Sequence, residues 1–387
     1  MSRRTGWIVA LFLSCSIGPA LADEAAPDRP ISDFTLKDTA GQARRLADFA
    51  DRDAVVVTFL GTECPIAKLY GPRLAQLAEK FPKVQFLAID SNQQDTAEEL
   101  AEYGRVHGIK FPLLKDPENA VADLFGAERT PEVFVLDRER HVVYRGRIDD
   151  QFGIDSLRDK PRESFLRQAL EDLAEGRPVK LPRTEAVGCH IGRVREVDPN
   201  AKVTWSNQIA LLFQKHCVEC HRPGDIGPFD LTQYTDTVGW GPMISEVVRQ
   251  QRMPPWHASD EFGKFRNRRG MSSDEKQLVY DWVTAGCPLG DAAAAPPPRE
   301  FSTRWQLPRD PDVVLEMRKQ PFTVPAEGTL EYQYFVVDPK FTEDKWIAAA
   351  EIVPGNRTVV HHAVAFIRPP DHTDFRGIGW VAGYVPG

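Results

Sequence analysis

The first half of the chain shows short apolar runs separated by amphipathic stretches. Residues 54–60 and 84–89 are continuous apolar runs rich in β-branched side chains, which predict two buried strands. The runs 132–136 and 142–146 flank a short polar turn at 138–141, a pattern typical of a β-hairpin. Four strands are therefore expected in the first half of the chain.

Helices are expected between and after these strands. Residues 96–107 form a polar helical stretch, and residues 163–175 form an amphipathic one. The alternation of strands and helices predicts an α/β sandwich over about residues 30–182. A third helix follows Cys64-Pro65, and its apolar face is expected to carry Leu69, Leu74, Leu77 and Phe81.

The middle of the chain, residues 183–290, carries helical signals. Residues 205–207 resemble a helix start, and Ser272 with Glu275 gives a capping signal before the apolar face of a closing helix. A run of alanine and proline then marks a linker at 291–304. We expect a mainly α domain ahead of this linker.

The last region, residues 305–387, is strand-like. Residues 332–337, 346–353 and 359–366 are apolar runs that read as β-strands. We expect a partial all-β (β-sandwich) segment here, so the fold class is multidomain: α/β, then mainly α, then partial β.

Length and charge narrow the classes of function. The chain has 387 residues, enough for two or three domains. Its net charge of −8 and the lack of a basic run argue against nucleic-acid binding. The oligomeric state is left open by the sequence.

The N-terminus resembles a secretory signal. Arg3 and Arg4 precede an apolar stretch at 8–17, and Ala20-Leu21-Ala22 supplies a cleavage site of small residues. We expect residues 1–22 to be removed and the mature protein to be periplasmic or otherwise exported, without a transmembrane segment. A lipoprotein signal at Cys15 is the weaker alternative.

The pattern with the most specific chemistry is Cys217-Val218-Glu219-Cys220-His221. Two thiols two residues apart, followed by an imidazole, are typical of covalent c-type haem attachment. Cys217 and Cys220 would form the thioethers, and His221 would bind the iron on its proximal side. The alternatives are a zinc half-site, which would need a second pair of ligands at suitable spacing, and a chance disulfide.

The residues after this motif strengthen the haem interpretation. The haem motif, a Met-Pro loop at Met253 and a closing amphipathic helix together resemble a class I cytochrome c domain. The resemblance implies Met253 as the distal iron ligand, with Met243, Met271 and His257 as alternatives. It also implies single-electron transfer with redox partner proteins.

A second site is predicted at Cys64. A strand, the loop Gly61 to Pro65, a helix, and a Thr130-Pro131 pair resemble the redoxin and peroxiredoxin-like branch of the thioredoxin-like superfamily. In that family the proline is cis and faces the reactive cysteine. A cysteine at a helix N-terminus has a lowered pKa, because the helix dipole stabilises the thiolate.

This sequence departs from the family at three positions. Thioredoxins carry a second cysteine where Ala67 stands, and peroxiredoxins carry threonine and proline where Gly61 and Val57 stand. Neither dithiol exchange nor standard peroxide reduction is therefore supported by the local motif.

Three roles remain open for Cys64: a lone redox thiol, one half of a disulfide with Cys189, or a structural relic. The chain could thus be a thiol peroxidase or disulfide oxidoreductase with the haem as electron source, or carry a non-catalytic docking module. Cys287 is either a free buried thiol or a partner of Cys189.

The last candidate site is His361-His362. On a strand, neighbouring side chains point to opposite faces, so the pair alone is a weak metal signal. With the segments Pro354 to Asn356 and Gly379 to Tyr384, however, it resembles the start of a type II copper, ascorbate-dependent monooxygenase. The resemblance implies His361 and His362 as copper ligands.

The copper site would be incomplete. His372 lies in a Pro/Asp loop and is not assumed to be the third ligand. We expect the chain to be a fragment that does not carry out monooxygenation by itself. The leading expectation is therefore an exported haem c protein that transfers single electrons, and that could feed a copper domain in the intact protein.

Overall fold

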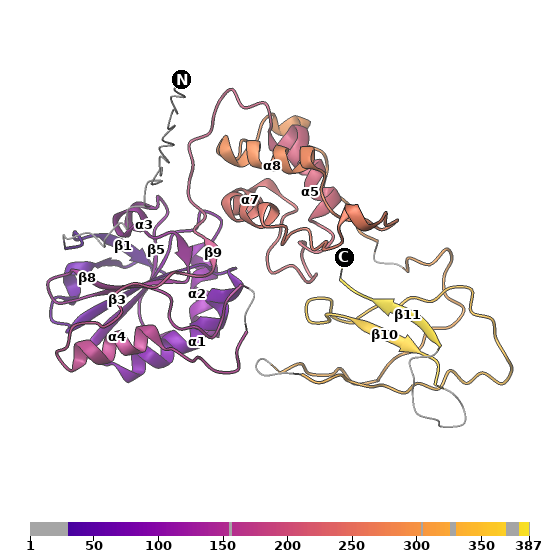
Figure 1. The fold of residues 1–387 in the computed structure, drawn as a ribbon, viewed down its shortest axis with the longest axis horizontal. Coiled ribbons are helices and arrows are strands. Elements are labelled where there is room, and N and C mark those ends of the chain that lie inside the picture. The colour runs from indigo at the N-terminus through magenta and orange to yellow at the C-terminus, as the bar shows by residue number, and fades with distance from the viewer. Residues whose placement is uncertain (1–29, 155–156, 303–304, 326–329, 369–378, 387) are drawn as a thin grey trace, which may run out of the picture.

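The computed structural model describes residues 30–154, 157–302, 305–325, 330–368 and 379–386. Over these residues an α/β region is followed by a helical region and then by an extended region (Figure 1). The predicted signal sequence lies outside the described residues. Among the residues that are described, no helix combines the length and apolar character needed to cross a membrane.

The α/β region is built on one large sheet. Its seven strands, counted over the described residues, run in the order β2-β1-β5-β4-β3-β7-β8. The three central strands β5, β4 and β3 are parallel, and their other neighbours pair antiparallel. The strands are β1 (Thr35–Asp38), β2 (Ala43–Arg45), β3 (Ala54–Leu60), β4 (Val84–Asp90), β5 (Leu113–Lys115), β7 (Glu132–Leu136) and β8 (Val142–Gly146).

Helices cover both faces of this sheet, which is why its central strand is apolar throughout. Alternate residues of β3 point to opposite faces. Val55 and Phe59 pack toward α3 (Ala120–Phe125), and Val56 packs toward α1 (Pro65–Lys80) and α4 (Phe165–Ala174). The α/β sandwich predicted from the sequence is therefore confirmed.

The predicted helices form, with one error in the expected faces. The helix at 96–107 is α2 (Ala97–Val106), and it begins with a capping box between Thr96 and Glu99. In α1, Leu74 and Leu77 are buried as expected, but Leu69 is exposed. Leu69 lies five residues before Leu74, which is about 140° around the helix axis.

The helical region follows after a connecting segment. It begins with a π-helical turn, η2 (Trp205–Ile209), and Trp282 packs with Trp205 and Phe213 at ring-centroid distances of 6.1 and 6.0 Å. A capping box between Ser272 and Glu275 starts α8, as predicted. The helices are α5 (Ala210–His216), α6 (Tyr234–Thr237), α7 (Gly241–Arg249) and α8 (Ser273–Thr284), with 3-10 turns η3 (Val238–Trp240), η4 (Asp260–Phe262) and η5 (Ala292–Ala294).

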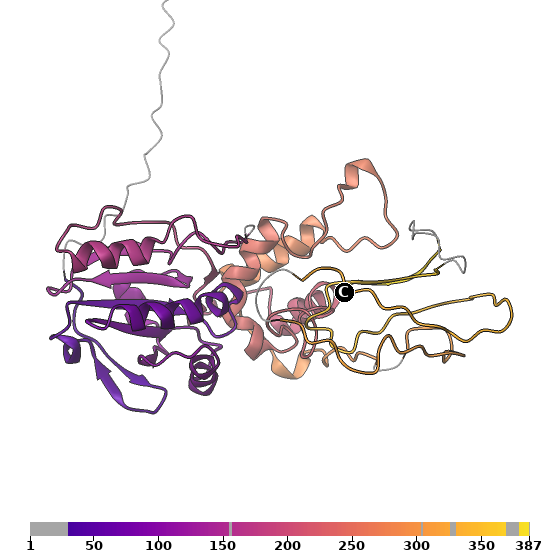
Figure 2. The same ribbon diagram turned by 90° about the horizontal axis from the view of Figure 1, so that it is seen from below.

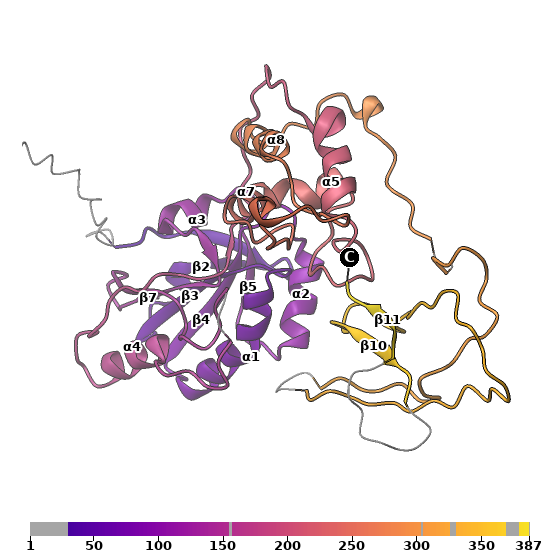
Figure 3. The same cartoon turned by 45° about the vertical axis from the view of Figure 1, so that its right-hand side comes forward.

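The helical region lies beside α2 of the α/β region (Figures 1 and 3). One continuous apolar cluster joins the two regions, with Leu100 and Tyr103 of α2 on one side and Met243 of α7 on the other. The thiols of Cys64 and Cys189 belong to this same cluster. The interface between the regions therefore forms part of the protein core.

The extended region departs from the prediction. The expected strands at 332–337 and 346–353 are wrong, since neither segment is a strand and most of their side chains are exposed. The expected strand at 359–366 shortens to β10 (Ala363–Phe366), which pairs antiparallel with β11 (Trp380–Tyr384). Apolar runs form strands only where a hydrogen-bonding neighbour is available, and a two-stranded pair is marginal by itself. The extended region projects away from the α/β region (Figure 2).

Candidate functional site

Cys64 lies where the central strand β3 gives way to helix α1. It is the N-cap residue of α1, and Pro65 occupies the first helical turn. Proline fits there because its missing N–H would have no partner in the helix. Cys64 Sγ lies 3.0 Å from the carbonyl oxygen of Thr130, and the side chain is 1% exposed. The thiol is thus buried at a helix N-terminus.

A pair of two-residue strands brings Cys189 to this thiol. Strand β6 (Arg129–Thr130) pairs antiparallel with β9 (Cys189–His190), and Thr130 lies directly opposite Cys189. The peptide bond between Thr130 and Pro131 is cis, as the family resemblance implied. Both thiols are free, and they lie close enough together that each is a main cause of the other's shifted pKa.

The contact with Cys189 sets the protonation of the two thiols. Burial raises the pKa of Cys64, but hydrogen bonds from the Cys189 thiol and from the backbone N–H groups of Ala67 and Cys189 outweigh it and lower that pKa to about 6. The hydrogen bond to Cys64 and burial together raise the pKa of Cys189 well above its ordinary value. These contacts favour ionisation of Cys64 before Cys189, so that Cys189 is the thiol of the pair that keeps its proton.

The approach of β9 to the cis-proline loop depends on Gly188. Its φ is +153°, and a Cβ placed there would lie 1.9 Å from the carbonyl oxygen of Thr130. Arg129 supports the same approach by donating from Nη1 to the carbonyl of Gly188 at 2.8 Å. A side chain at position 188 would push Cys189 away from Cys64.

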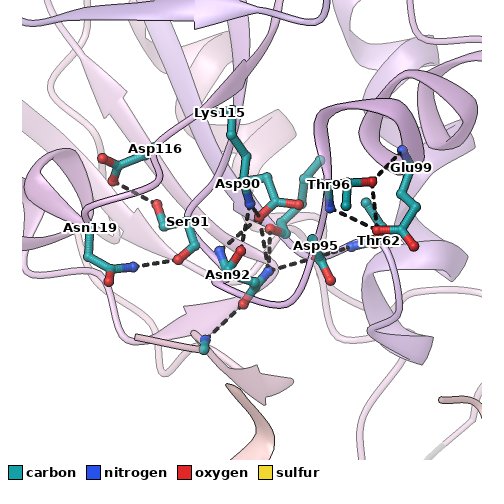
Figure 4. Close-up of polar contacts among 12 residues, drawn as sticks. Thr62, Asp90, Ser91, Asn92, Asp95, Thr96, Glu99, Lys115, Asp116 and Asn119 are labelled. Carbon is teal, nitrogen blue, oxygen red and sulfur yellow. Dashed lines mark hydrogen bonds and ion pairs between the residues drawn. The ribbon is translucent and has the colours of Figure 1, made fainter. Parts of the chain in front are cut away.

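A buried polar network holds the loop that precedes Cys64 (Figure 4). The backbone N–H of Thr62 donates to Asp95 Oδ2 at 2.8 Å, and the Asn92 side chain donates to the same oxygen at 3.1 Å. Lys115 donates to Asp90 at 3.0 Å. Burial, followed by the charge of Asp95, raises the pKa of Asp90 well above its usual range. The residues at and just after the ends of β4 and β5 thus hold the loop that precedes Cys64 in place.

A second polar cluster joins the thiol site to the helical region. Glu246 of α7 accepts hydrogen bonds from Arg129 and Arg252, each at 2.8 Å, and its Oε2 lies 2.8 Å from His190 Nε2. Arg129 and His190 lie on the two short strands that carry Thr130 and Cys189. Sequence reasoning missed this cluster, because nothing in the local pattern around residues 129 or 246 marks them as neighbours.

Cys287, the other proposed partner of Cys189, lies elsewhere in the core. It follows α8, and a Cβ at Gly241 would lie 2.5 Å from its sulfur. Burial raises the pKa of Cys287 to about 12. Cys64, rather than Cys287, is the thiol in contact with Cys189.

The predicted haem residues lie at the end of α5. Cys217 is the C-cap residue of that helix, and the backbone N–H groups of Cys220 and His221 both donate to its carbonyl oxygen. His221 Nδ1 lies 3.1 Å from the carbonyl oxygen of Phe229. That contact occupies Nδ1 and leaves Nε2 as the ring nitrogen for a metal, which fits the donor set expected of a proximal ligand.

Of the methionines proposed as distal ligands, Met253 is 42% exposed, whereas Met243 and Met271 are buried. Core packing therefore does not account for Met253. Close to it in sequence, Trp256 Nε1 is buried without a hydrogen-bond partner among the described residues. His257, the remaining alternative, is exposed.

The two histidines predicted for copper lie just before β10, not within it. Strand alternation therefore does not separate them, and His361 Nδ1 lies 3.1 Å from His362 Nδ1. The pair has no third metal-ligating neighbour, since no cluster of three or more His, Cys, Asp or Glu side chains suited to a metal occurs among the described residues. His372 lies outside the described residues. The copper site stays a prediction.

Comparison with known proteins identifies the α/β region. Residues 27–145 match the family model described as the AhpC/TSA family. The thiol-disulfide oxidoreductase ResA of Bacillus subtilis (strain 168) is 27% identical over 149 residues, which is 36% of this chain and 80% of that protein. A putative chloroplastic peroxiredoxin Q of Oryza sativa subsp. indica is 31% identical over 134 residues, or 33% of this chain and 59% of that protein.

A solved structure of a hypothetical protein from Sinorhizobium meliloti 1021 is 31% identical to this chain. It matches 43% of this chain and 94% of its own length with a TM-score of 0.41. The family match, which ends at residue 145, lies within the α/β region. That region is a thioredoxin-like redoxin domain, as the sequence predicted. The cytochrome c and copper monooxygenase resemblances stay predictions.

Proposed function

We propose that this protein is a thiol–disulfide oxidoreductase in which Cys64 is the nucleophile and Cys189 is the resolving thiol. The single observation that carries the proposal is the meeting of the two thiols at the cis-proline loop, where Cys64 Sγ contacts the carbonyl oxygen of Thr130 and Thr130 pairs directly with Cys189. The relatives named thiol-disulfide oxidoreductases support the same chemistry for the α/β region. Thioredoxins carry their second cysteine at the position of Ala67. In this protein Cys189 of β9 takes over the role of that second cysteine.

The first half of the reaction follows from the two pKa values. At neutral pH Cys64 is a thiolate with its pKa lowered to about 6. It attacks one sulfur of a substrate disulfide and forms a mixed disulfide, and the other substrate sulfur leaves as a thiolate that takes up a proton. Because the negative charge at Cys64 is then gone, the main cause of the raised pKa of Cys189 is removed as well.

In the second half, Cys189 loses its proton and attacks the sulfur of Cys64. The Cys64–Cys189 disulfide forms, and the second substrate sulfur leaves and takes up the released proton. Two electrons have then passed from the protein to the substrate. A small dithiol returns the pair to the dithiol state by the reverse exchange and is itself oxidised to a disulfide.

The proposal is tested by exchange with glutathione disulfide, followed by non-reducing peptide mapping. We expect a Cys64–Cys189 linkage in the native sequence, none in Cys64→Ser, and an unchanged linkage in the control Cys287→Ala. If both thiols stay free, or if glutathione stays attached to Cys64 without resolution, the α/β region is a docking module or a single-thiol site instead. Replacing glutathione disulfide with hydrogen peroxide tests the peroxidase alternative.

A second function, electron transfer through a c-type haem in the helical region, is favoured by the His221–Phe229 contact. Cys217 and Cys220 would attach the haem covalently, His221 would bind its iron, and Met253 would be the second axial ligand. A haem held in this way supplies single-electron transfer. Such attachment, with the N-terminal signal, also favours an exported protein.

Protein produced with a cytochrome c maturation system tests this second function. We expect the intact mass to increase by one haem and the denatured, reduced protein to give a c-type pyridine spectrum. Colourless protein with the mass of its amino acids alone would refute haem attachment and leave the thiol proposal unaffected.

A further inference from the structure

The thiol pair lies beneath the helical region, and this position limits what can reach it. Cys64 is 1% exposed and Cys189 is 7% exposed. Both belong to the apolar cluster that continues into the helical region through Met243 and Trp240. A folded protein that presents a disulfide needs direct contact with the attacking sulfur, and a nearly buried thiol does not offer such contact.

Two sets of contacts hold the helical region, which covers the thiols, against the α/β region. Glu246 of α7 accepts from Arg129 and contacts His190, so that one carboxylate connects the helical region to both short strands of the thiol site. Glu246 is partly buried, with its side chain 15% exposed, and this strengthens its ion pairs relative to those of a surface residue.

The second fastening uses the backbone of the connecting segment. Gln93 N donates to the carbonyl oxygen of Gly192 at 2.7 Å, and Gly192 N donates to Asn92 Oδ1 at 2.9 Å. The side chain of Gln94 approaches so closely that a Cβ at Gly239 would lie 1.9 Å from its Oε1. The backbone of the helical region thus packs directly on the loop after β4.

We propose that the helical region is a built-in cover that makes the thiol pair selective for small disulfides over protein disulfides, with Glu246 as the residue that fastens it. The inference rests on the proposed function of the pair, and it names the substrate class of that same site. Small disulfides reach the pair through local motions of the cover, while a protein disulfide requires α7 to separate from the two short strands. Glu246 is a positioning residue, because it acts on access and does not touch the reacting sulfurs.

The test compares two maleimides that share a reactive group and differ in size: N-ethylmaleimide and a maleimide carrying a long polyethylene glycol chain. The full-length protein is exposed briefly to one reagent and quenched. It is then unfolded and labelled with iodoacetamide, and the unreacted Cys64 peptide is quantified by mass spectrometry. The ratio of the two rates reports access to Cys64 independently of its pKa, because both reagents need the same thiolate.

We expect the small reagent to react faster with native Cys64 by about tenfold or more, and the two rates to converge in Glu246→Gln. The matched control is Glu275→Gln, which removes a carboxylate of the helical region that pairs with Lys215 and His216. The control should keep the native ratio. Circular dichroism and urea unfolding of both variants show that they are folded.

Two results would overturn the inference. Equal rates for the two reagents in the native protein would show that the thiols are not screened by size. An unchanged ratio in a folded Glu246→Gln variant would show that Glu246 does not fasten the cover. Either result leaves the exchange chemistry of Cys64 and Cys189 intact. Failure to form their disulfide with glutathione disulfide would instead refute the proposed function, and the inferred substrate class with it, whatever the ratio of the two maleimide rates.

Discussion

The most direct consequence of the thiol geometry is the protonation state of Cys64. A thiol with a pKa of about 6 is about 90% thiolate at pH 7, whereas one with the ordinary value of 9.0 is about 1% thiolate. The hydrogen bond from the Cys189 thiol is the largest of the effects that lower this pKa. Replacing Cys189 with alanine removes that donor and keeps the backbone N–H of residue 189.

The expected size of the change follows from the strength of the lost interaction. A hydrogen bond to a charged group contributes about 1.5–3 kcal/mol, and about 1.4 kcal/mol corresponds to one pH unit. In Cys189→Ala the titration midpoint of Cys64 should therefore rise by about one to two pH units. Cys189→Ser retains a hydroxyl donor, and its midpoint should rise less.

A reaction rate measured at a single pH would be a poor test of the lowered pKa of Cys64. The thiolate fraction at pH 7 rises about 90-fold when the pKa falls from 9.0 to about 6. The intrinsic nucleophilicity of the thiolate falls with its pKa by about 20-fold over the same range, so that the net gain is only about fivefold. The shape of the pH profile is the diagnostic quantity.

The assay is a pH titration of the ultraviolet absorbance of the thiolate, taken as the difference between the native protein and Cys64→Ser. We expect a midpoint near pH 6, a higher one in Cys189→Ala, and no change in the control Cys287→Ala. A native midpoint near pH 9, or one that Cys189→Ala leaves in place, would refute the assignment of Cys189 as the donor that stabilises the Cys64 thiolate.

Three other perturbations test separate parts of the structure. Gly188→Ala should abolish the Cys64–Cys189 linkage in non-reducing peptide maps, because the new methyl group would meet the Thr130 carbonyl; the control Gly41→Ala, also at positive φ but with nothing within 4 Å, should keep it. Asp95→Ala should lower the free energy of unfolding in urea by about 1–3 kcal/mol, since it leaves the buried N–H of Thr62 unpaired; an unchanged midpoint would contradict the role given to Asp95. In matured protein, His221→Ala should keep the added mass of the haem but lose the visible spectrum of a histidine-ligated iron.

The sequence alone specified the elements whose signals are local. The apolar run at 54–60 became the central strand β3, and the capping boxes at Thr96 and Ser272 mark the starts of α2 and α8. Such signals are readable because hydrogen bonds within one turn and continuous apolar runs depend on residues close together in the chain. Cys64 at a helix N-terminus was predictable for the same reason.

Local sequence patterns were misleading where a strand needs a neighbouring strand to pair with. The apolar run at 346–353 resembles a strand, but no neighbouring strand pairs with it in the described structure. Strand alternation alone would point His361 and His362 apart, whereas the copper monooxygenase resemblance implied that they act together; because they precede β10, their Nδ1 atoms lie 3.1 Å apart. In both cases the outcome depends on where the strand pairing begins and ends, which neighbouring residues do not encode.

Only the tertiary structure decided that Cys189 meets Cys64 and that Glu246 contacts the two short strands beside them. Cys64 and Cys189 lie far apart in the sequence. Their contact depends on the pairing of β6 with β9, two strands of two residues each, which are too short to leave a pattern in the sequence. The meeting of Glu246 with Arg129 likewise depends on how the helical region packs on the redoxin domain. The sequence specified which residues can do chemistry, and the packing of distant segments determined which of them act together, because burial and hydrogen bonding are properties of the folded contact.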